Sequence, residues 1–412
     1  MNFDTPAVLL RSGHHGGLGI VRSLGRLGVP VYTIDAQRWE TAFASRYCSG
    51  RFMLDTASAP PESSVSRLLE IGRRIGGNPV LIPTTDQTAI WVAEHTAELE
   101  PAYRFSCPSP ELVRLLCDKS RMQELARQCG VPTPRAVLPR SKEDIEQFLQ
   151  TADLPVIAKA TDTERFRRFA GASKLIVQTR DDLLALYRKA GDPANPCFLI
   201  QEYIPGEDWM FDGYFDGRSE CRFGIVGKKI RRFPVNTGIT SLGVCLRNLT
   251  VEFTTARFMK VLGYRGILDI GYRYDRRDGK YKVLDVNPRI GCTFRLFASA
   301  DGADVARALY LDLTGQPVPP ARCIEGRKWI VDDFDLVSSL RLIASGSLRP
   351  KDWLRSLRGI EETACFAWDD PLPFLLTAAS DCFEMARWLR GRSRARTWTA
   401  ARQQSPSSIS AS

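Results

Sequence analysis

The sequence predicts an α/β and α+β multidomain protein, and three observations support that prediction. Over residues 1–110, short apolar runs alternate with helical patterns, which is typical of βαβ units on a parallel sheet. Longer strands with alternating polarity follow and favour mixed or antiparallel sheets. The chain of 412 residues is also long enough for two or three domains with a large buried core.

The composition is that of an ordinary globular protein, with 44% apolar and 25% charged residues. The net charge of +10 suits nucleic acid, an anionic membrane or small anionic ligands. Six arginines lie between Arg387 and Arg402 with no acid among them, so part of the excess belongs to the C-terminal tail. We therefore expect no nucleic-acid partner. Residues 373–398 mix an apolar run with Trp and Arg, which predicts either weak contact with acidic lipid surfaces or a packed helix before a loose tail.

The cysteines and histidines exclude several kinds of chemistry. The eleven cysteines are scattered and form no CxxC motif, so we expect reduced thiols in a cytoplasmic protein. The first apolar run is too short for a secretory signal, and no segment approaches the ~20 apolar residues of a membrane span. His14, His15 and His95 are the only histidines, which counts against hydrolase triads and zinc enzymes.

The chain opens with a predicted βαβ unit. An apolar strand at residues 6–11 leads through a glycine-rich turn into a helical pattern at 20–27 and a second strand at 29–35. The glycine spacing is not GxGxxG, so we favour a tight turn over a nicotinamide site, and an oxidoreductase is the less favoured hypothesis. His14 and His15 in this turn are expected in a solvated loop, with ligand contact as the alternative.

A second strand and helix are predicted over residues 78–99. Thr84, Thr85 and Asp86 lie between them, where polar side chains commonly cap a helix. Residues 109–130 then read as two short helices, with Cys117-Asp118-Lys119 at their junction.

A predicted β-hairpin carries two facing carboxylates. Residues 266–275 and 280–288 are rich in β-branched and aromatic side chains, and an Asp-Gly turn signal separates them. If the loop is centred on Arg277, Asp269 lies directly across from Asp285. Like charges repel at such a position unless a cation binds between them. Asn287 shares the face of Asp285. Three hard oxygen ligands suit Mg²⁺, against the simpler interpretation of an exposed hairpin whose acids face water.

Polar residues upstream of the hairpin could hold a nucleotide. Lys159 lies in an apolar strand and needs an anionic partner, either a phosphate or a structural acid. Lys119 lies between the two short helices. The strand at residues 198–204 runs into a Pro-Gly turn, and its backbone could bond an adenine edge. Glu207 and Asp208 follow, where a carboxylate could accept from ribose hydroxyls.

These motifs, taken in order, make residues 1–315 resemble the ATP-grasp superfamily. The resemblance is to carboxylate–amine ligases with a Rossmann-like domain ahead of the grasp, and it is strongest to bacterial carboligase-like proteins related to D-aspartate ligase. It implies a Rossmann-like pre-ATP-grasp domain and then an ATP-grasp fold. The implied ranges are 1–110 for the first domain, 111–195 for the small subdomain, and 196–315 for the large subdomain with the metal site. Beyond the resemblance, the sequence predicts a region of uncertain fold at 316–385 and, from its composition, a basic, disordered tail at 386–412.

The resemblance also implies roles for single residues. Lys119 and Lys159 match the family's two phosphate-binding lysines, and Arg289 matches the arginine that supports the transferred phosphate. Arg289 and Lys159 are thus the implied catalytic residues. The implied metal ligands are Asp269, Asp285 and Asn287. The implied nucleotide contacts are Lys119, Lys159, Lys174, Gln201, Glu202, Tyr203, Ile204, Glu207 and Asp208, with Asp208 favoured over Glu207 for the ribose.

Two departures from the family pattern are visible in the sequence. The second metal acid, more often Glu in the family, is Asp285 here. The phosphate-covering loop, usually rich in Gly and Ser, is replaced by residues 161–174, which contain Arg165, Arg167 and Arg168. These arginines could cover phosphates, bind an acidic substrate, or simply face solvent.

The implied activity is formation of an amide or similar bond through an acyl phosphate, with release of ADP and phosphate. It uses ATP with Mg²⁺ or Mn²⁺ and needs no histidine base. The implied partners are a small carboxylic acid and an amine, and a homodimer is a further expectation. A non-catalytic ATP-binding regulatory or scaffold protein is the alternative. Lys229, Arg231 and Arg232 are candidates to bind an acceptor carboxylate or phosphate, or else line an exposed strand.

Overall fold

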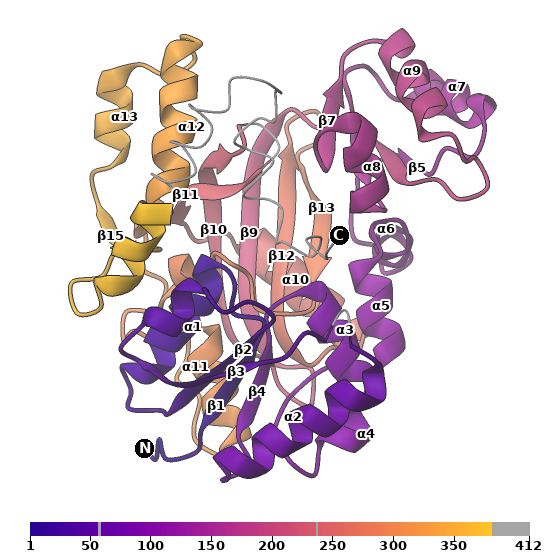
Figure 1. Cartoon of the computed structure of the whole chain (residues 1–412). Helices are drawn as coiled ribbons and strands as arrows, with labels where there is room; N and C mark the ends of the chain where they lie inside the picture. The colour runs from indigo at the N-terminus through magenta and orange to yellow at the C-terminus, as the bar shows by residue number, and fades with distance from the viewer. Residues whose placement is uncertain (57–58, 236–237, 381–412) are drawn as a thin grey trace. The chain divides into compact units, whose positions relative to one another are not determined.

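The computed structural model describes residues 1–56, 59–235 and 238–380, which form two compact units (Figure 1). The larger unit consists of Met1–Cys117, Asp208–Gly271 and residues 286–380. The smaller unit consists of Asp118–Glu207 and Tyr272–Asp285. The predicted tail at 386–412 lies outside the described residues, and the domain ranges stay predictions.

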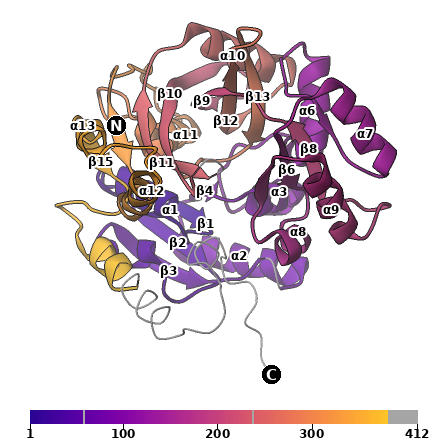
Figure 2. The same ribbon diagram turned by 90° about the horizontal axis from the view of Figure 1, so that it is seen from above.

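The N-terminal part of the larger unit is a four-stranded parallel sheet in the order β3-β2-β1-β4. Figure 2 shows β1, β2 and β3 side by side. Its strands are β1 (Ala7–Leu10), β2 (Val31–Asp35), β3 (Cys48–Met53) and β4 (Val80–Pro83). Its helices are α1 (His15–Gly25), η1 (Thr41–Ala44), α2 (Pro61–Ile75), α3 (Asp86–Glu94), α4 (Thr96–Leu99) and α5 (Pro110–Cys117). The predicted βαβ unit is confirmed, because β1 and β2 flank α1 and pair in parallel.

The glycine-rich turn differs from the prediction. Helix α1 begins at His15, not at residue 20, because the glycines themselves form its first turn. His14 caps the helix, with its Nδ1 accepting from the N–H of Gly17 at 3.3 Å. A Cβ on Gly17 would stand 2.3 Å from the Ser12 carbonyl oxygen, so only glycine fits there. The expected solvated loop is wrong for both histidines, since both are half-buried and the His15 ring packs on Trp329.

The predicted capping turn before α3 is confirmed. The Thr85 side chain accepts a hydrogen bond from the N–H of Thr88, and the Thr88 side chain accepts one from the N–H of Thr85. This capping box satisfies helix N–H groups that would otherwise lack a partner.

A seven-stranded sheet in the order β13-β12-β9-β10-β11-β14-β15 follows. Strands β9, β10 and β11 are antiparallel neighbours, and the predicted hairpin is confirmed because β12 and β13 are hydrogen-bonded neighbours. The strands are β9 (Gly206–Phe215), β10 (Cys221–Phe233), β11 (Ile239–Cys245), β12 (Gly266–Asp275), β13 (Lys280–Asn287), β14 (Lys328–Ile330) and β15 (Ile360–Thr363). The helices of this part are α10 (Leu249–Val261), η2 (Phe294–Phe297), α11 (Val305–Leu313), α12 (Asp332–Ala344) and α13 (Pro350–Ser356).

One apolar core joins the two sheets of the larger unit. Ile20 and Leu24 of α1 belong to the same buried cluster as Phe294 of η2, Met210 of β9 and Trp329 of β14. Region 316–385, whose fold the sequence left open, contributes β14, α12, α13 and β15 among its described residues. This packing holds the glycine-rich first turn of α1 close to the segment that follows β13.

The smaller unit contains an antiparallel sheet in the order β5-β8-β6-β7. Its strands are β5 (Ala136–Val137), β6 (Val156–Ala160), β7 (Lys174–Val177) and β8 (Phe198–Glu202), and its helices are α6 (Lys119–Gln128), α7 (Lys142–Thr151), α8 (Thr163–Ala170) and α9 (Arg180–Ala190). The junction predicted between two short helices is confirmed, with Asp118 capping α6. The predicted phosphate-covering loop is instead largely helix α8. None of the helices described in either unit has the length and apolar content to cross a bilayer.

Candidate active site

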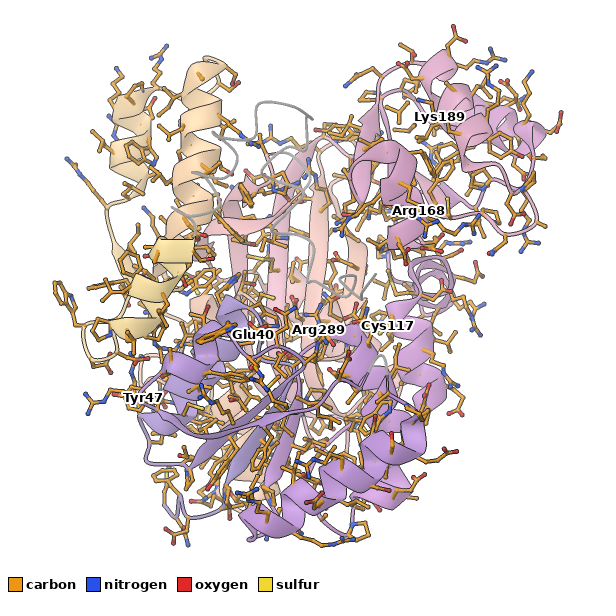
Figure 3. All side chains as sticks on the ribbon, viewed as in Figure 1. Glu40, Tyr47, Cys117, Arg168, Lys189 and Arg289 are labelled. Carbon is orange, nitrogen blue, oxygen red and sulfur yellow. The ribbon has the colours of Figure 1, made fainter. Side chains whose placement is uncertain are left out.

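Three of the predicted site residues lie together in the larger unit. Arg289 donates from Nη1 to Asp269 Oδ2 at 3.5 Å, and the Asn287 amide donates to the same oxygen at 3.2 Å. The Nε of Arg289 donates to Asp86 Oδ1 at 2.9 Å, at the start of α3. Burial lowers the pKa of Arg289, but the Asp86 and Asp269 carboxylates more than offset it, so the pKa is raised. Arg289 is labelled in Figure 3, and its permanently charged guanidinium lies between the carboxylates of Asp86 and Asp269.

These residues offer the kind of donors that Mg²⁺ prefers. Asp269 supplies a carboxylate, and a flip of the Asn287 amide would turn its oxygen toward the same point. In the described part of the chain, no group of three or more His, Cys, Asp or Glu residues is placed to hold a metal ion. Carboxylate and amide oxygens such as those of Asp269 and Asn287 suit a hard cation shared with a phosphate better than zinc. Asp285 belongs to the smaller unit, so its position opposite Asp269 stays a prediction.

Asp212 on β9 is a buried acid that the sequence analysis missed. Its side chain is 0% exposed, and neither carboxylate oxygen has a hydrogen-bond partner in the structure. Burial raises its pKa well above the ordinary value, the charges of Asp269 and Asp304 raise it further, and Arg289 only partly offsets this. The sequence did carry a signal for Asp212, because it is a single charged residue within the apolar part of β9. Lys159 was singled out for the same reason in its own apolar strand.

His14 and Cys292 form a second missed feature, near Arg289. The Cys292 sulfur lies 3.6 Å from Nδ1 of His14. Burial raises the pKa of the thiol, but His14 and then Arg289 outweigh it, so the pKa is lowered. Burial lowers the pKa of His14, but Cys292 offsets it, so that pKa is raised. The sequence offered only a cysteine three positions after Arg289, and the cysteine spacing predicted reduced thiols with no special role for this one.

The three predicted lysines meet at one end of the small sheet. Lys119 Nζ donates to the carbonyl of Ala160 at 2.5 Å, and Lys159 directly precedes Ala160 on β6. Lys159 and Lys174 are register partners on β6 and β7. Lys159 is only 5% exposed, so a bound anion would face little competition from water there. This arrangement is consistent with phosphate binding, and the roles of the lysines stay predictions.

The Glu202 carboxylate at the end of β8 is held by protein cations. Arg135 donates to it from its backbone N–H at 3.0 Å and from Nη2 at 3.1 Å, and Lys282 and Arg277 lie within 3.4 and 3.3 Å. Burial raises the pKa of Glu202, but the N–H of Arg135 and the charge of Lys282 outweigh it, so the pKa is lowered. Because these cations bind the Glu202 carboxylate, any contact with adenine at this position would be made by the backbone N–H and C=O groups.

The rest of the predicted hinge is braced by Arg273. Its guanidinium lies over the Tyr203 ring, 5.7 Å from the centroid, and its Nε donates to the Ile204 carbonyl at 2.9 Å. Gln201 is 1% exposed, and its side-chain oxygen has no hydrogen-bond partner in the structure. The Gln201 oxygen can therefore accept a hydrogen bond, and an adenine amino group is one possible donor.

The predicted ribose acids have protein partners, and so do Arg231 and Arg232 among the predicted acceptor-binding residues. In the larger unit, Asp208 is 7% exposed and ion-paired with Arg232. In the smaller unit, Glu207 lies 3.7 Å from Arg276. Arg231 is not a substrate residue, because its buried guanidinium binds both oxygens of Asp335 at 2.8 and 2.7 Å.

The arginines of residues 161–174 are engaged locally. Arg168, labelled in Figure 3, pairs with Glu164 one turn back on α8, and Arg165 lies 3.7 Å from Asp192. Capture of phosphate by either would therefore first require breaking an ion pair, although exposed pairs of this kind are weak.

The chain resembles known ligases in sequence and in fold. No family model matches it. It is 25% identical over 244 residues to D-aspartate ligase of Enterococcus faecium, covering 55% of this chain and 57% of that protein. It is 24% identical over 266 residues to the large chain of carbamoyl phosphate synthase of Rubrobacter xylanophilus, covering 61% of this chain and 24% of that protein. The chain thus spans about half or less of the length of these relatives.

Two solved structures show the same fold at low identity. N5-carboxyaminoimidazole synthetase of Staphylococcus aureus, solved with ADP, superposes with a TM-score of 0.61 at 13% identity, covering 79% of this chain and 81% of that one. L-amino acid ligase of Bacillus licheniformis gives 0.56 at 13% identity, covering 75% and 74%. The fold is thus a mixed α/β fold shared with these ligases. By its fold and its sequence relatives, the chain resembles members of the ATP-grasp superfamily.

Proposed function

We propose that this protein is an ATP-dependent ligase that joins a carboxylate to an amine through an acyl phosphate and releases ADP and phosphate. The observation that carries the proposal is the convergence of Arg289 and Asn287 on Asp269 in a chain with the ATP-grasp fold. Its relatives include a D-aspartate ligase and a structural neighbour named an L-amino acid ligase. The substrates in this proposal are a small carboxylic acid and an amine, and the enzyme is cytoplasmic and homodimeric.

We assign the ligand-holding roles to the residues that match the family pattern. Lys119, Lys159 and Lys174 would hold the phosphates, and the segment from Gln201 to Ile204 would hold adenine. Either Glu207 or Asp208 would hold the ribose, and to do so it would have to break its ion pair with Arg276 or Arg232 respectively. Asp269, Asp285 and Asn287 would hold Mg²⁺ or Mn²⁺. Residues 1–110 form a Rossmann-like pre-grasp domain in this assignment.

When bound, Mg-ATP supplies the phosphoryl group that activates the substrate carboxylate for attack by the amine. The protein's part is to bring two anions together and to stabilise the charge on the transferring group. Arg289 is suited to this role because its fork is already oriented by Asp86 and partly occupied by Asp269. A cation at Asp269 would weaken that ion pair and leave an Nη group of Arg289 for a phosphoryl oxygen.

A screen for ADP release with paired carboxylic acids and amines tests the proposal. Arg289→Lys keeps the charge but loses the planar fork, so we expect kcat/KM to fall by roughly 10²–10³-fold, as for other lost transition-state donors. Arg67→Ala, which removes an exposed arginine paired with Glu70, is the matched control and should leave turnover unchanged. Full activity of Arg289→Lys would contradict the assignment.

A nucleotide-binding regulator or scaffold is the second candidate. Helix α8 favours it, because a helix with its own ion pair occupies the segment where the family has a flexible phosphate-covering loop. This candidate predicts that ATP binds but that no acid and amine pair stimulates ADP release. ADP release that depends on both substrates would dismiss it.

A further inference from the structure

The ten cysteines that the structure describes are free thiols, but they are not equivalent. Burial raises the pKa of Cys221 to about 12, although the residue is exposed to solvent. The pKa of Cys323 is lowered by a hydrogen bond from the neutral thiol of Cys245, not by a cation. The thiol of Cys292 differs because an imidazole and a guanidinium both favour its thiolate.

The chain builds the contact between His14 and Cys292 from two distant segments. A Cβ on Gly16 would stand 2.8 Å from the His14 ring and 2.9 Å from the Cys292 Cα, so the glycine lets the helix start press onto the cysteine. In the neutral ring, Nδ1 of His14 accepts from the N–H of Gly17 and also lies 3.6 Å from the sulfur. Formation of the imidazolium therefore replaces the bond from Gly17 with one that Nδ1–H donates to the sulfur. The Thr84 carbonyl lies on the ring as well and raises the pKa of His14, while Nε2 has no hydrogen bond of normal geometry.

The charges around the pair favour an imidazolium beside a thiolate. Arg289 attracts the thiolate and repels the imidazolium, and Asp269 opposes the thiolate more weakly. Glu40, on the loop after β2, also faces His14. A cysteine with a cationic imidazole in contact is the arrangement that makes a thiol nucleophilic at neutral pH.

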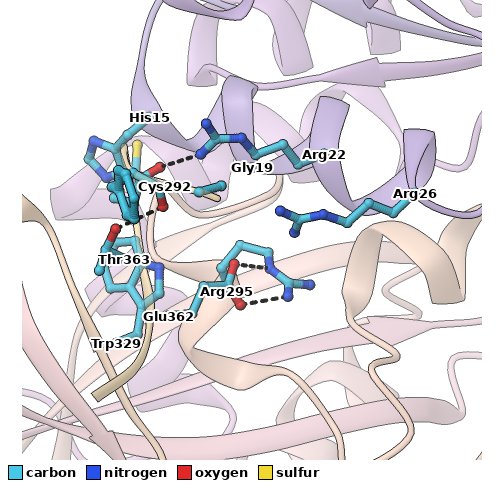
Figure 4. A pocket seen from close by; sticks show the side chains of 12 residues that line it. His15, Gly19, Arg22, Arg26, Cys292, Arg295, Trp329, Glu362 and Thr363 are labelled. Carbon is cyan, nitrogen blue, oxygen red and sulfur yellow. Dashed lines mark hydrogen bonds and ion pairs between the residues drawn. The ribbon is translucent and has the colours of Figure 1, made fainter. Parts of the chain in front are cut away.

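A small cavity gives access to Cys292. Figure 4 shows this residue and His15 among the side chains that line it, with Arg22, Arg295 and Trp329 around them. The cavity has about 20 Å³ of room for water-sized molecules, which is space for roughly one water. The small size of the cavity therefore limits which molecules can react with Cys292. A bulky thiol or disulfide does not fit, whereas a molecule little larger than water does.

We propose that Cys292 is a modification site, a nucleophilic cysteine that is oxidised by hydrogen peroxide with His14 as the proton donor. The thiolate sulfur attacks one peroxide oxygen, a sulfur–oxygen bond forms, and the oxygen–oxygen bond breaks. The leaving hydroxide takes the Nδ1 proton of His14 and becomes water. The sulfur is oxidised to sulfenic acid, the peroxide is reduced, and His14 ends neutral.

Oxidation at this position would act on the ligase site, a consequence that rests on the proposed function. Gly291, which precedes Cys292, has no room for a Cβ because Asp269 Oδ2 would lie 2.6 Å away. An oxygen added to the sulfur, together with loss of the ion pair, would disturb a turn packed directly against Asp269. We therefore expect sulfenic acid at Cys292 to lower ligase turnover.

The test treats the folded full-length protein with limiting hydrogen peroxide, removes the excess, and then unfolds the protein in dimedone, so that sulfenic acid formed inside the small cavity is trapped before peptide mapping. We expect the Cys292 peptide to be tagged first and the more exposed Cys221 to stay untagged. His14→Asn is the key variant, because Asn is a good helix cap but carries no imidazole. Its Cys292 tagging should slow by roughly tenfold for each unit by which the thiol pKa rises. Tagging of Cys221 before Cys292, or an unchanged rate in a folded His14→Asn protein, would overturn the proposal.

Ligase assays keep this proposal separate from the proposed function. Peroxide should lower ADP release by the wild type, and Cys292→Ser should keep its turnover after the same treatment. Equal inactivation of both would overturn the link between oxidation and ligation. If no substrate pair releases ADP, the proposed function fails, while the dimedone map still decides whether Cys292 is the oxidation site.

Discussion

Replacing Asp212 with Asn should stabilise this protein, which is the reverse of what most buried substitutions do. The carboxylate is 0% exposed, and neither oxygen has a hydrogen-bond partner among the described residues. An unpartnered buried polar group costs about 1–3 kcal/mol, and an ionised one costs more. Asn has nearly the same shape and is still polar, so the substitution removes only the cost linked to ionisation. That cost is about 1.4 kcal/mol for each unit by which the folded pKa lies above the ordinary value, and we therefore expect the free energy of unfolding to rise by at least about 1–3 kcal/mol at neutral pH.

The effect should depend on pH in a defined direction. The pKa of Asp212 is raised above its ordinary value of 3.8 in the folded protein. Below pH 3.8 the acid is protonated in both states, so it adds no penalty. As the pH rises, the unfolded chain releases the proton while the folded protein keeps it, so wild-type stability falls until the folded pKa is passed. The gain from Asn should therefore start near zero in acid and grow toward neutral pH.

Urea denaturation across this pH range measures the effect, and Asp335→Asn is the matched control. Asp335 is equally buried, at 1% exposed, but binds both guanidinium donors of Arg231. Removing its charge leaves Arg231 buried and unpaired, which typically costs about 3–5 kcal/mol. Destabilisation by Asp212→Asn, or a gain that does not change with pH, would refute the argument that this carboxylate is unpaired.

Three further outcomes test other parts of the structure. Burial raises the pKa of Glu40 to about 7, so Glu40→Gln should raise stability above pH 7 and have little effect below the ordinary value of 4.5, as denaturation at the two pH values would show. Glu202→Gln should lower the melting temperature through a loss of about 1–3 kcal/mol, because it weakens the cluster of cations around that side chain; an unchanged melting temperature would mean that the cluster adds nothing. Gly17→Ala should destabilise by about 1–3 kcal/mol, because the new Cβ would meet the Ser12 carbonyl. Gly217→Ala, where a Cβ meets nothing within 4 Å, is its control, and equal melting temperatures of the two variants would contradict the packing argument.

The features predicted correctly from the sequence are those set by neighbouring residues. The βαβ opening follows from apolar runs of strand length around a helical period, and the capping box needs only Thr85 and Thr88 in their spacing. The hairpin follows from the Asp-Gly turn between two β-branched runs. Asn287 and Arg289 lie two positions apart on the chain, so their common approach to Asp269 required only that the hairpin form.

The features missed depend on residues far apart in the chain. His14 and Cys292 are 278 positions apart, and no local pattern could pair them. The glycines before residue 20 suggested a turn, but packing against the segment after β13 let them begin a helix. Arg231 seemed available for a substrate until the fold placed Asp335, from a region whose fold the sequence left open, against it.

The sequence by itself determined the kinds of groups present and their order: lysines on the small sheet, an acid and an amide on the hairpin, and an arginine after it. Only the tertiary structure decided which of these charges are already neutralised by the protein and which are not. Glu202 and Arg231 are bound by protein partners, while Asp212 has none. The physical reason is that partnering and burial depend on three-dimensional distance, which chain spacing sets only within a turn, a helix or a hairpin.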